Sequence, residues 1–267
     1  RGHVVEGGRR VEARGVDDVA RVGWPGHGGG GADGDPPLGE VRLQRRGHRP
    51  GVGDAIRLSA LCATASTAVS LALGVPLGWI LAYARFPGRA LLRAVVLVPL
   101  LLPPLVSGVG LLSILGRRGV AGRWLDDWFG VTLPFSTAGV IVAVAFVALP
   151  FVVITMESGF RSVDRRLGLA AATLGAGPAS VARTVTLPLV APSLAAGGAL
   201  AWARSLGEFG ATVTFAGNLP GRTQTLPLAT FLALESDLDQ AVLLSMLMLF
   251  PTLIVLALLR NRWRPLS

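Results

Sequence analysis

Long uncharged runs dominate the chain from residue 56 onward. Five runs reach or exceed the roughly 20 apolar residues that one helical membrane crossing needs. They cover residues 58–84, 94–116, 128–156, 184–203 and 240–259. The stretch 205–239 is only semi-apolar and is rich in Gly, Pro and Thr. We expect a broken or re-entrant element and a short helix there, because irregular backbone at membrane depth must be buried in protein. The pattern predicts an all-α polytopic membrane protein with about five transmembrane helices.

The second run carries adjacent prolines at positions 103 and 104. Proline removes a backbone donor and clashes with the preceding turn, so we expect the helix to be kinked or broken at this point. Broken helices often border the transport path of membrane carriers. The second run is therefore a candidate for lining such a path.

Residues 1–53 differ from the rest, because they are rich in Gly and Arg and contain no long apolar run. Such a segment cannot bury enough surface to offset its ordering entropy, so we expect a disordered tail. A second interpretation is that these residues are not native sequence but result from a frameshift or misplaced start that replaced an earlier span. The remaining residues, 54–267, are predicted to form one transmembrane domain.

Composition agrees with a membrane protein and weakens other classes. The chain has 267 residues, 51% hydrophobic and 15% charged, with a net charge of +9. All basic residues are Arg, and most lie in short stretches between apolar runs, where membrane topology rather than nucleic-acid binding explains them. The single Cys, Cys62, excludes a disulfide framework. The three His all lie before residue 49, which excludes a histidine metal cluster in the apolar body. We find no nucleophile–base pattern, so an enzyme is not expected.

The arginines also predict orientation. The loops 85–93 and 157–183 together with the C-terminal tail carry ten Arg and two acids, whereas the opposite side carries five Arg and six acids. Because cytoplasmic loops are enriched in basic residues, we expect the first group, including the C-terminus, to face the cytoplasm. With five spans the polar tail 1–53 would then have to be translocated.

The loop 157–183 contains the most informative spacing. An Ala- and Leu-rich stretch ends at Gly175, a good helix C-cap, and a second short helix is expected from Pro178. The segment 164–188 resembles the cytoplasmic loop of bacterial ABC-importer permeases, whose pattern is E-A-A, three residues, G, nine residues, I, one residue, L-P. The matching positions are Leu169, Ala170, Ala171, Gly175, Val185, Leu187 and Pro188. Leu169 stands where the family has Glu, which puts the efficiency of coupling in doubt; the alternative is an ordinary Ala-rich interfacial helix.

A second segment narrows the resemblance. Residues 202–229 read WARSLGEFGATVTFAGNLPGRTQTLPLA and resemble the permease of molybdate ABC importers, as does most of 54–267. The resemblance implies the type I ABC-importer permease fold, for which six spans are usual, in a bacterial plasma membrane. It implies a homodimer with a second permease copy, a dimer of ABC ATPase subunits that uses ATP and Mg²⁺, and an extracytoplasmic molybdate-binding protein. No cofactor bound by this chain and no nucleic-acid partner are expected. Sulfate or tungstate remain alternative substrates.

Residues at the end of the fourth run are candidates for the path or its gate. Arg204 and Glu208 lie one helical turn apart, so we expect an ion pair that either holds the chain break or borders the path. Gly207 and Gly210 flank the pair and could act as a hinge or merely punctuate a loop. Thr212 and Thr214 could donate hydroxyl hydrogen bonds to an oxyanion, although helical Thr more often bonds its own backbone.

Other functions are kept as alternatives. A stand-alone channel or secondary transporter would need its own coupling-ion site, and Glu208 is the single membrane-embedded acid that we find. A truncated, non-functional permease is the other alternative, because Leu169 and the unusual N-terminal segment both depart from the family pattern.

Overall fold

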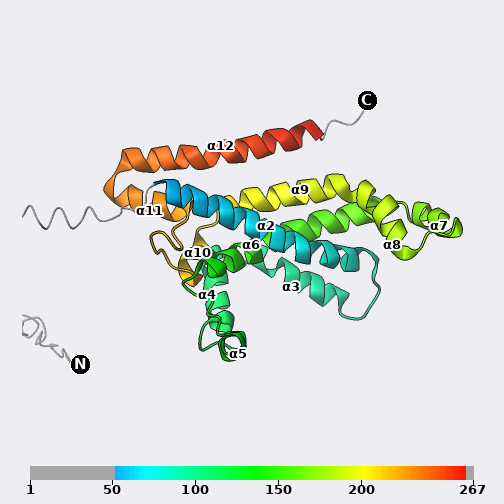
Figure 1. Cartoon of the computed structure of the whole chain (residues 1–267), viewed down its shortest axis with the longest axis horizontal. Coiled ribbons are helices and arrows are strands. Elements are labelled where there is room, and N and C mark those ends of the chain that lie inside the picture. The colour runs from blue at the N-terminus through cyan, green and yellow to red at the C-terminus, as the bar shows by residue number, and fades with distance from the viewer. Residues whose placement is uncertain (1–51, 263–267) are drawn as a thin grey trace, which may run out of the picture. The chain divides into compact units, whose positions relative to one another are not determined.

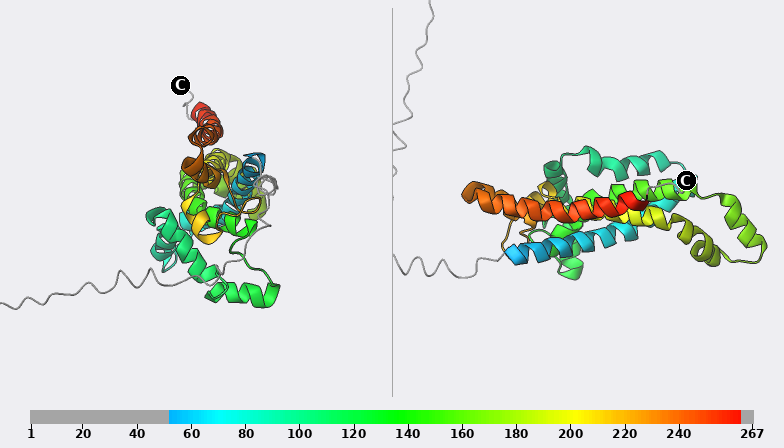
Figure 2. Two further views of the ribbon diagram at one scale, coloured as in Figure 1. Left: turned by 90° about the vertical axis from the view of Figure 1, so that its left-hand side faces the viewer. Right: turned by 90° about the horizontal axis from the view of Figure 1, so that it is seen from above.

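The computed structural model describes residues 52–262, and every regular element within them is a helix. The tail expected over residues 1–53 lies outside the described residues, except that the first described helix already begins at Val52. Within the described part, four segments are long and apolar enough to cross a membrane: Val52–Tyr83, Thr137–Ser162, Pro178–Leu206 and Leu238–Val255. Figures 1 and 2 show their helices running along one another. The all-α polytopic prediction is confirmed.

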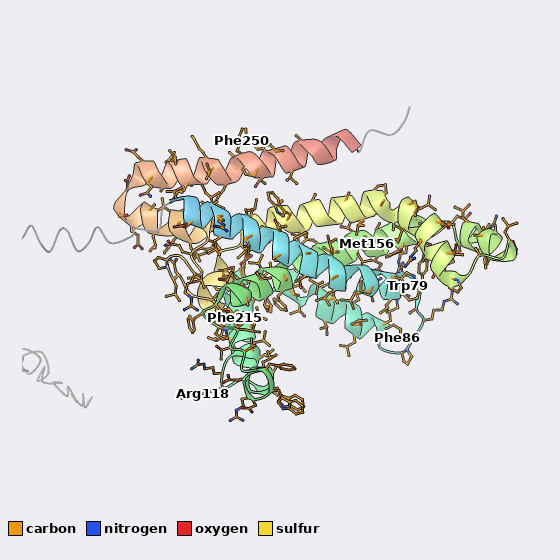
Figure 3. All side chains as sticks on the ribbon, in the orientation of Figure 1. Trp79, Phe86, Arg118, Met156, Phe215 and Phe250 are labelled. Carbon is orange, nitrogen blue, oxygen red and sulfur yellow. The ribbon has the colours of Figure 1, made fainter. Side chains whose placement is uncertain are left out.

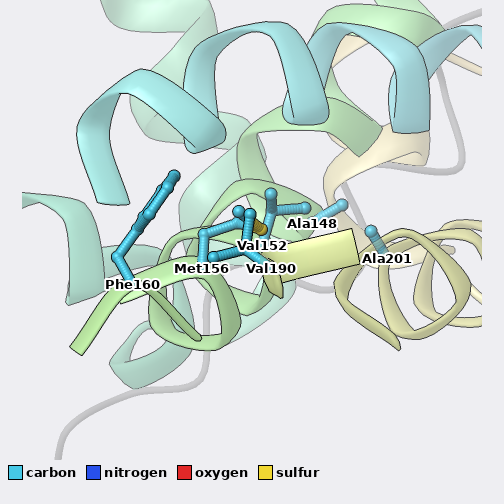
Figure 4. Close-up of a cluster of buried hydrophobic side chains, with 6 residues drawn as sticks. All are labelled: Ala148, Val152, Met156, Phe160, Val190 and Ala201. Carbon is cyan, nitrogen blue, oxygen red and sulfur yellow. The ribbon is translucent and has the colours of Figure 1, made fainter. Parts of the chain in front are cut away.

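Helix α6 (Thr137–Ser162) lies at the centre, between α2 (Val52–Tyr83) and α9 (Leu187–Leu206). Of its most apolar window, 61% is buried inside the protein, against 11% for the last span. Its side chains meet those of α9 in a buried cluster, seen in Figure 4, made of Ala148, Val152, Met156, Phe160, Val190 and Ala201. Because lipid tails are as apolar as these side chains, van der Waals fit rather than water exclusion holds them together.

Small residues let α2 approach α6 closely. A Cβ on Gly74 would lie 2.7 Å from Val152 Cγ1, and one on Gly78 would lie 2.8 Å from Met156 Cβ. The two glycines are four residues apart, so they share one face of α2. Ser70 adds a hydrogen bond from its Oγ to the carbonyl of Ala145, at 3.2 Å. The α2–α6 contact is therefore a close backbone approach.

The predicted second span is two short helices rather than one. α3 (Arg89–Leu101) ends before Pro103, and α4 (Pro104–Leu115) begins with Pro104 in its first turn. Leu102 and Pro103 separate the two helices, and both have extended backbone with ψ of 138°. A short amphipathic helix, α5 (Val120–Phe129), follows α4. The break expected at the two prolines is confirmed.

The segment between α6 and α9 is also helical. It comprises α7 (Arg165–Thr173), α8 (Pro178–Val181) and the π-helical turn η2 (Ala182–Thr186), which runs directly into α9. Figure 1 places α7 and α8 beyond the ends of the long helices. The loop expected to start at residue 157 starts later, because α6 continues to Ser162. Glu157 is therefore part of a spanning helix rather than of a loop.

The semi-apolar stretch after α9 contains α10 (Gly210–Phe215) and α11 (Leu226–Ser236), joined by irregular backbone. This matches the broken element and short helix expected there. The last helix, α12 (Leu238–Arg262), packs mainly against α11 and α9. Figure 3 shows Phe250 of α12 pointing away from the bundle, whereas Met156 and Phe215 lie inside it.

Candidate functional site

The helix of the predicted coupling segment begins and ends with defined caps. The carboxylate of Asp164 accepts a hydrogen bond from the backbone N–H of Arg166, at 2.9 Å. At the other end Gly175 adopts a left-handed φ of 87°, and the N–H of Ala176 donates to the carbonyl of Ala171 at 3.1 Å. A left-handed residue after the last helical turn is the usual place for Gly. Gly175 therefore turns the chain out of α7, as the spacing predicted.

The seven motif positions fall into two groups. Leu169, Ala170 and Ala171 lie on α7, which buries no residue against the rest of the chain; Leu169 is 66% exposed. Val185 lies half-buried in η2, and Leu187 and Pro188 begin α9. The motif thus joins an exposed short helix to the start of a spanning helix.

Arg204 and Glu208 form the expected ion pair at the other end of α9. Arg204 Nη1 lies 2.6 Å from Glu208 Oε2, although the angle is that of an ion pair rather than of an aligned hydrogen bond. The Arg204 side chain is 30% exposed, and that of Glu208 is 1% exposed. Gly207 ends α9 between them with an unstrained φ of −90°. The buried carboxylate is thus neutralised by a partly accessible cation.

Glu208 also joins α9 to the next helix. Its Oε1 accepts a hydrogen bond from the backbone N–H of Ala211, at 3.0 Å, in the first turn of α10. One carboxylate therefore holds both the end of α9, through Arg204, and the start of α10. These contacts connect the two sides of the chain break at Gly207, which is consistent with an ion pair that holds the break.

Gly210 and Gly207 differ in what surrounds them. A Cβ on Gly210 would lie 2.7 Å from Pro104 Cβ, whereas a Cβ on Gly207 would have no neighbour within 4 Å. On the facing helix, a Cβ on Gly108 would lie 2.7 Å from the carbonyl oxygen of Ala211. Helices α4 and α10 therefore touch through glycines directly beside the break in the second span. Gly210 is required by packing, and Gly207 is not.

The two candidate threonines of α10 are not equivalent. Thr214 Oγ1 donates to the carbonyl of Gly210 at 2.9 Å, which is ordinary bonding to its own helix. Thr212 is fully buried, and its Oγ1 has no hydrogen-bond partner among the described residues. The same holds for Ser107 Oγ on α4, the helix that packs against α10. Two buried hydroxyls of α4 and α10 therefore have no hydrogen-bond partner among the described residues. One is Thr212, a predicted candidate, and the other is Ser107.

The coupling and gate candidates are not brought together. Leu187 and Leu206 bound α9, whose 20 residues separate its ends by about 30 Å at 1.5 Å per residue. Within residues 52–262 no three His, Cys, Asp or Glu side chains gather as a metal site would require.

Sequence reasoning missed an ion cluster around Glu157. This α6 carboxylate contacts Arg93 of α3 and lies 2.7 Å from Arg161 Nη2 and 3.8 Å from Arg89 Nη2. Arg89 and Arg161 also donate to the carbonyl oxygen of Leu81 on α2. The four-residue spacings of Arg89 and Arg93, and of Glu157 and Arg161, were visible, but their helices could not be paired from the pattern. The cluster ties three helices together at the end nearest α7.

Known proteins resemble this chain over most of its length. The model of the family described as "Binding-protein-dependent transport system inner membrane component" matches residues 74–264. The chain is 47% identical over 201 residues to the molybdenum transport system permease protein ModB of Mycobacterium tuberculosis. The matched region covers 74% of this chain and 75% of that protein. It is 41% identical over 209 residues to the protein of the same name from Escherichia coli, and this match covers 78% of this chain and 91% of that protein.

A solved structure gives the same fold. The inward-facing MetNI methionine ABC transporter superposes with a TM-score of 0.56 over 79% of this chain and 95% of that chain, at 18% sequence identity. A likeness at this identity concerns the arrangement of helices rather than the cargo. Family model, relatives and fold agree: the chain belongs to the binding-protein-dependent transport system inner membrane components, the permease subunits of ABC importers.

Proposed function

We propose that this chain is the membrane-spanning permease subunit of an ATP-driven importer for molybdate. The observation that carries the proposal is the 47% identity to a permease whose name states molybdenum transport, sustained over 201 residues. The segment 202–229, which contains the motifs Gly-Glu-Phe-Gly and Ala-Gly-Asn, lies inside the region matched by the family model. Tungstate and sulfate share the tetrahedral dianion, so they are the competing cargoes.

The chain would be driven by a separate ATPase. In this proposal ATP and Mg²⁺ bind to a dimer of ABC ATPase subunits, and the permease binds no cofactor of its own. Exposed α7 would sit in a cleft of the ATPase, because its small residues Ala170 and Ala171 allow close backbone approach. Leu169 would contribute an apolar contact where other permeases place a carboxylate. Closure of the ATPase dimer would push α7 and, through η2, the start of α9.

The translocation path would lie between two copies of the chain. The broken junction of α3 and α4 and the adjoining α10 are the segments that we assign to its wall, because Gly108 and Gly210 bring α4 and α10 into direct contact beside the break. Arg204, being partly exposed, would lower the electrostatic barrier for an anion. The hydroxyls of Ser107 and Thr212 are buried in this arrangement, and they would offer donors to the anion only where α4 and α10 separate during transport.

Orientation follows from the distribution of arginine. We place the chain in a bacterial plasma membrane with α7 and the C-terminus in the cytoplasm, because that side carries ten Arg and two acids. An extracytoplasmic molybdate-binding protein would then deliver cargo to the side that holds α5 and α10.

The test is ATP hydrolysis by the complex reconstituted in liposomes with its cognate ATPase and binding protein. Molybdate-loaded binding protein should stimulate hydrolysis severalfold, and sulfate should do so less. Ala170→Arg places a long cation on the exposed face of α7 and should abolish stimulation and co-purification of the ATPase. The matched control is Ala90→Arg, an exposed alanine on α3, which should leave both unchanged.

Three outcomes would count against the proposal. Hydrolysis that ignores the loaded binding protein would indicate a permease that no longer couples. Stronger stimulation by sulfate would reassign the cargo. Anion flux through the chain without any ATPase would favour a stand-alone channel.

A further inference from the structure

A cavity between α3 and α6 has two halves of opposite polarity. It encloses about 470 Å³ at the end of the bundle nearest α7. One half is lined by Val96, Leu97 and Ile154, and the other by Arg93, Glu157, Ser158 and Arg161. The polar residues lie nearer the α7 end of both helices, and the apolar ones lie about one to two turns deeper. Polarity therefore falls along the cavity toward the membrane interior.

The polar half carries more positive than negative charge. Three guanidinium groups surround the single carboxylate of Glu157, so two positive charges have no counter-ion within this cluster. The arginines are also the accessible partners, since the side chains of Arg93 and Arg161 are 43% and 49% exposed, against 12% for Glu157. Their outer N–H groups can therefore reach an external anion while they keep the internal one.

The apolar half is open to a hydrocarbon chain. Ile154 is 45% exposed, and Val95, which is adjacent to the lining residue Val96 on α3, is 58% exposed. Exposed apolar side chains of this kind can contact the acyl chain of a lipid in a bilayer. A free inorganic oxyanion would use only the arginine half and would leave the apolar half without a partner.

We infer that this cavity binds an anionic phospholipid, with its headgroup phosphate on Arg93 and Arg161 and one acyl chain along Val96, Leu97 and Ile154. Basic pockets between membrane helices on the cytoplasmic side are suited to anionic headgroups. Bound lipid would brace α3 against α6, and through Arg89 also the end of α2. The site goes beyond the proposed function, because it concerns neither the cargo nor the ATPase.

The experiment measures lipid retention by the purified full-length chain. The protein is extracted from bilayers of equal phosphatidylglycerol and phosphatidylcholine, washed with detergent, and its bound lipids are counted by native mass spectrometry. Wild type should retain phosphatidylglycerol in preference to phosphatidylcholine. The preference should fall about fivefold for each arginine replaced in Arg93→Gln and Arg161→Gln. Arg117→Gln with Arg118→Gln, two exposed arginines between α4 and α5, is the matched control and should change nothing.

Two further variants separate binding from folding. Ile154→Trp fills the apolar half and should remove retention with all charges in place. Glu157→Gln removes the competing carboxylate and should strengthen retention, whereas a purely structural cluster would only weaken the protein. Since no transport is measured, failure here is distinct from failure of the molybdate proposal.

The outcomes that overturn the inference are specific. Equal retention of both lipids by wild type would remove the headgroup site. Displacement of phosphatidylglycerol by millimolar phosphate or molybdate, with Ile154→Trp behaving as wild type, would make this an inorganic anion site. A disulfide between two copies bearing Ile154→Cys would make it an interface between chains.

Discussion

Arg204 and Glu208 depend on each other unequally. Glu208 is almost completely buried, so its charge needs a cation nearby, whereas Arg204 is partly exposed and can reach water or headgroups through its long side chain. Removing one partner of a buried pair is costly mainly because it strands the other charge. The two single substitutions should therefore differ, although they break the same contact.

Arg204→Gln should lower the free energy of unfolding by about 3 kcal/mol, because it leaves a buried carboxylate without a cation. Glu208→Gln should cost about 1 kcal/mol, since the amide oxygen can still accept from Ala211. Denaturation in detergent micelles, followed by circular dichroism, measures both. The control is Arg118→Gln, at an exposed position between α4 and α5. Equal losses would contradict the asymmetry.

The pair itself could be predicted from its four-residue spacing, but its second role could not. Nothing in the sequence places the N–H of Ala211 on Glu208, because the chain leaves the helix at Gly207 and its path depends on α4. The same limit applies to the threonines. Thr212 and Thr214 are equivalent in the sequence, and only the fold makes one bond its own helix while the other stays buried and unpaired.

At the level of helices, the crossing of α2 and α6 leaves little room for larger side chains. Gly74 and Gly78 lie against Val152 and Met156 of α6, and the Cβ position on Gly78 is also 3.1 Å from the backbone nitrogen of Glu157. A side chain there meets backbone that cannot move without shifting all of α6. Larger residues at this crossing should force the two helices apart.

Gly78→Leu should destabilise the protein by about 2 to 3 kcal/mol through overpacking. Gly110→Leu is the matched control, because Gly110 on α4 is exposed and has no neighbour within 4 Å of its Cβ position. It should change stability by less than about 0.5 kcal/mol. Thermal midpoints of the purified chain in one detergent compare them. Similar midpoints for both variants would show that the crossing tolerates separation.

Helix breaks were more predictable than helix pairings. Pro103 and Pro104 predict the interruption of the second span, because proline disrupts a helix whatever its tertiary surroundings. The extension of α6 through Glu157 to Ser162 was missed, because charge ends an apolar run without ending a helix. The Gly-x-x-x-Gly spacing at Gly74 and Gly78 was a visible signal for close helix contact that the sequence analysis did not use.

For the whole molecule, the distribution of arginine predicts which side of the membrane each loop faces, and the fold alone does not determine it. Leu174, after α7, is 88% exposed, and Val120, at the start of α5, is 83% exposed. In intact cells, a membrane-impermeant maleimide should label Val120→Cys but label Leu174→Cys only after permeabilisation. The native Cys62 should add no background, since it is 2% exposed inside α2. The reverse labelling pattern would invert the proposed topology.

The spans could be predicted because a bilayer leaves a chain few alternatives to helices. Which spans touch could not, because lipid-facing and protein-facing residues are equally apolar. Phe250 and Met156 both sit in long apolar runs, yet the first is exposed at 68% and the second is fully buried. The candidate site was likewise only partly predictable. The motif positions of α7 followed from sequence spacing, whereas the Glu157 cluster could be found only from the tertiary fold.

The placement of α12 has a consequence for how the protein is made. The contacts among α2, α6 and α9 are complete once residue 206 has been synthesised, and α12 packs mainly against α11 and α9. The tightest part of the bundle can therefore assemble while the last helix is still being translated. α12 then adds to a surface that already exists, so the final step of biogenesis is docking rather than nucleation.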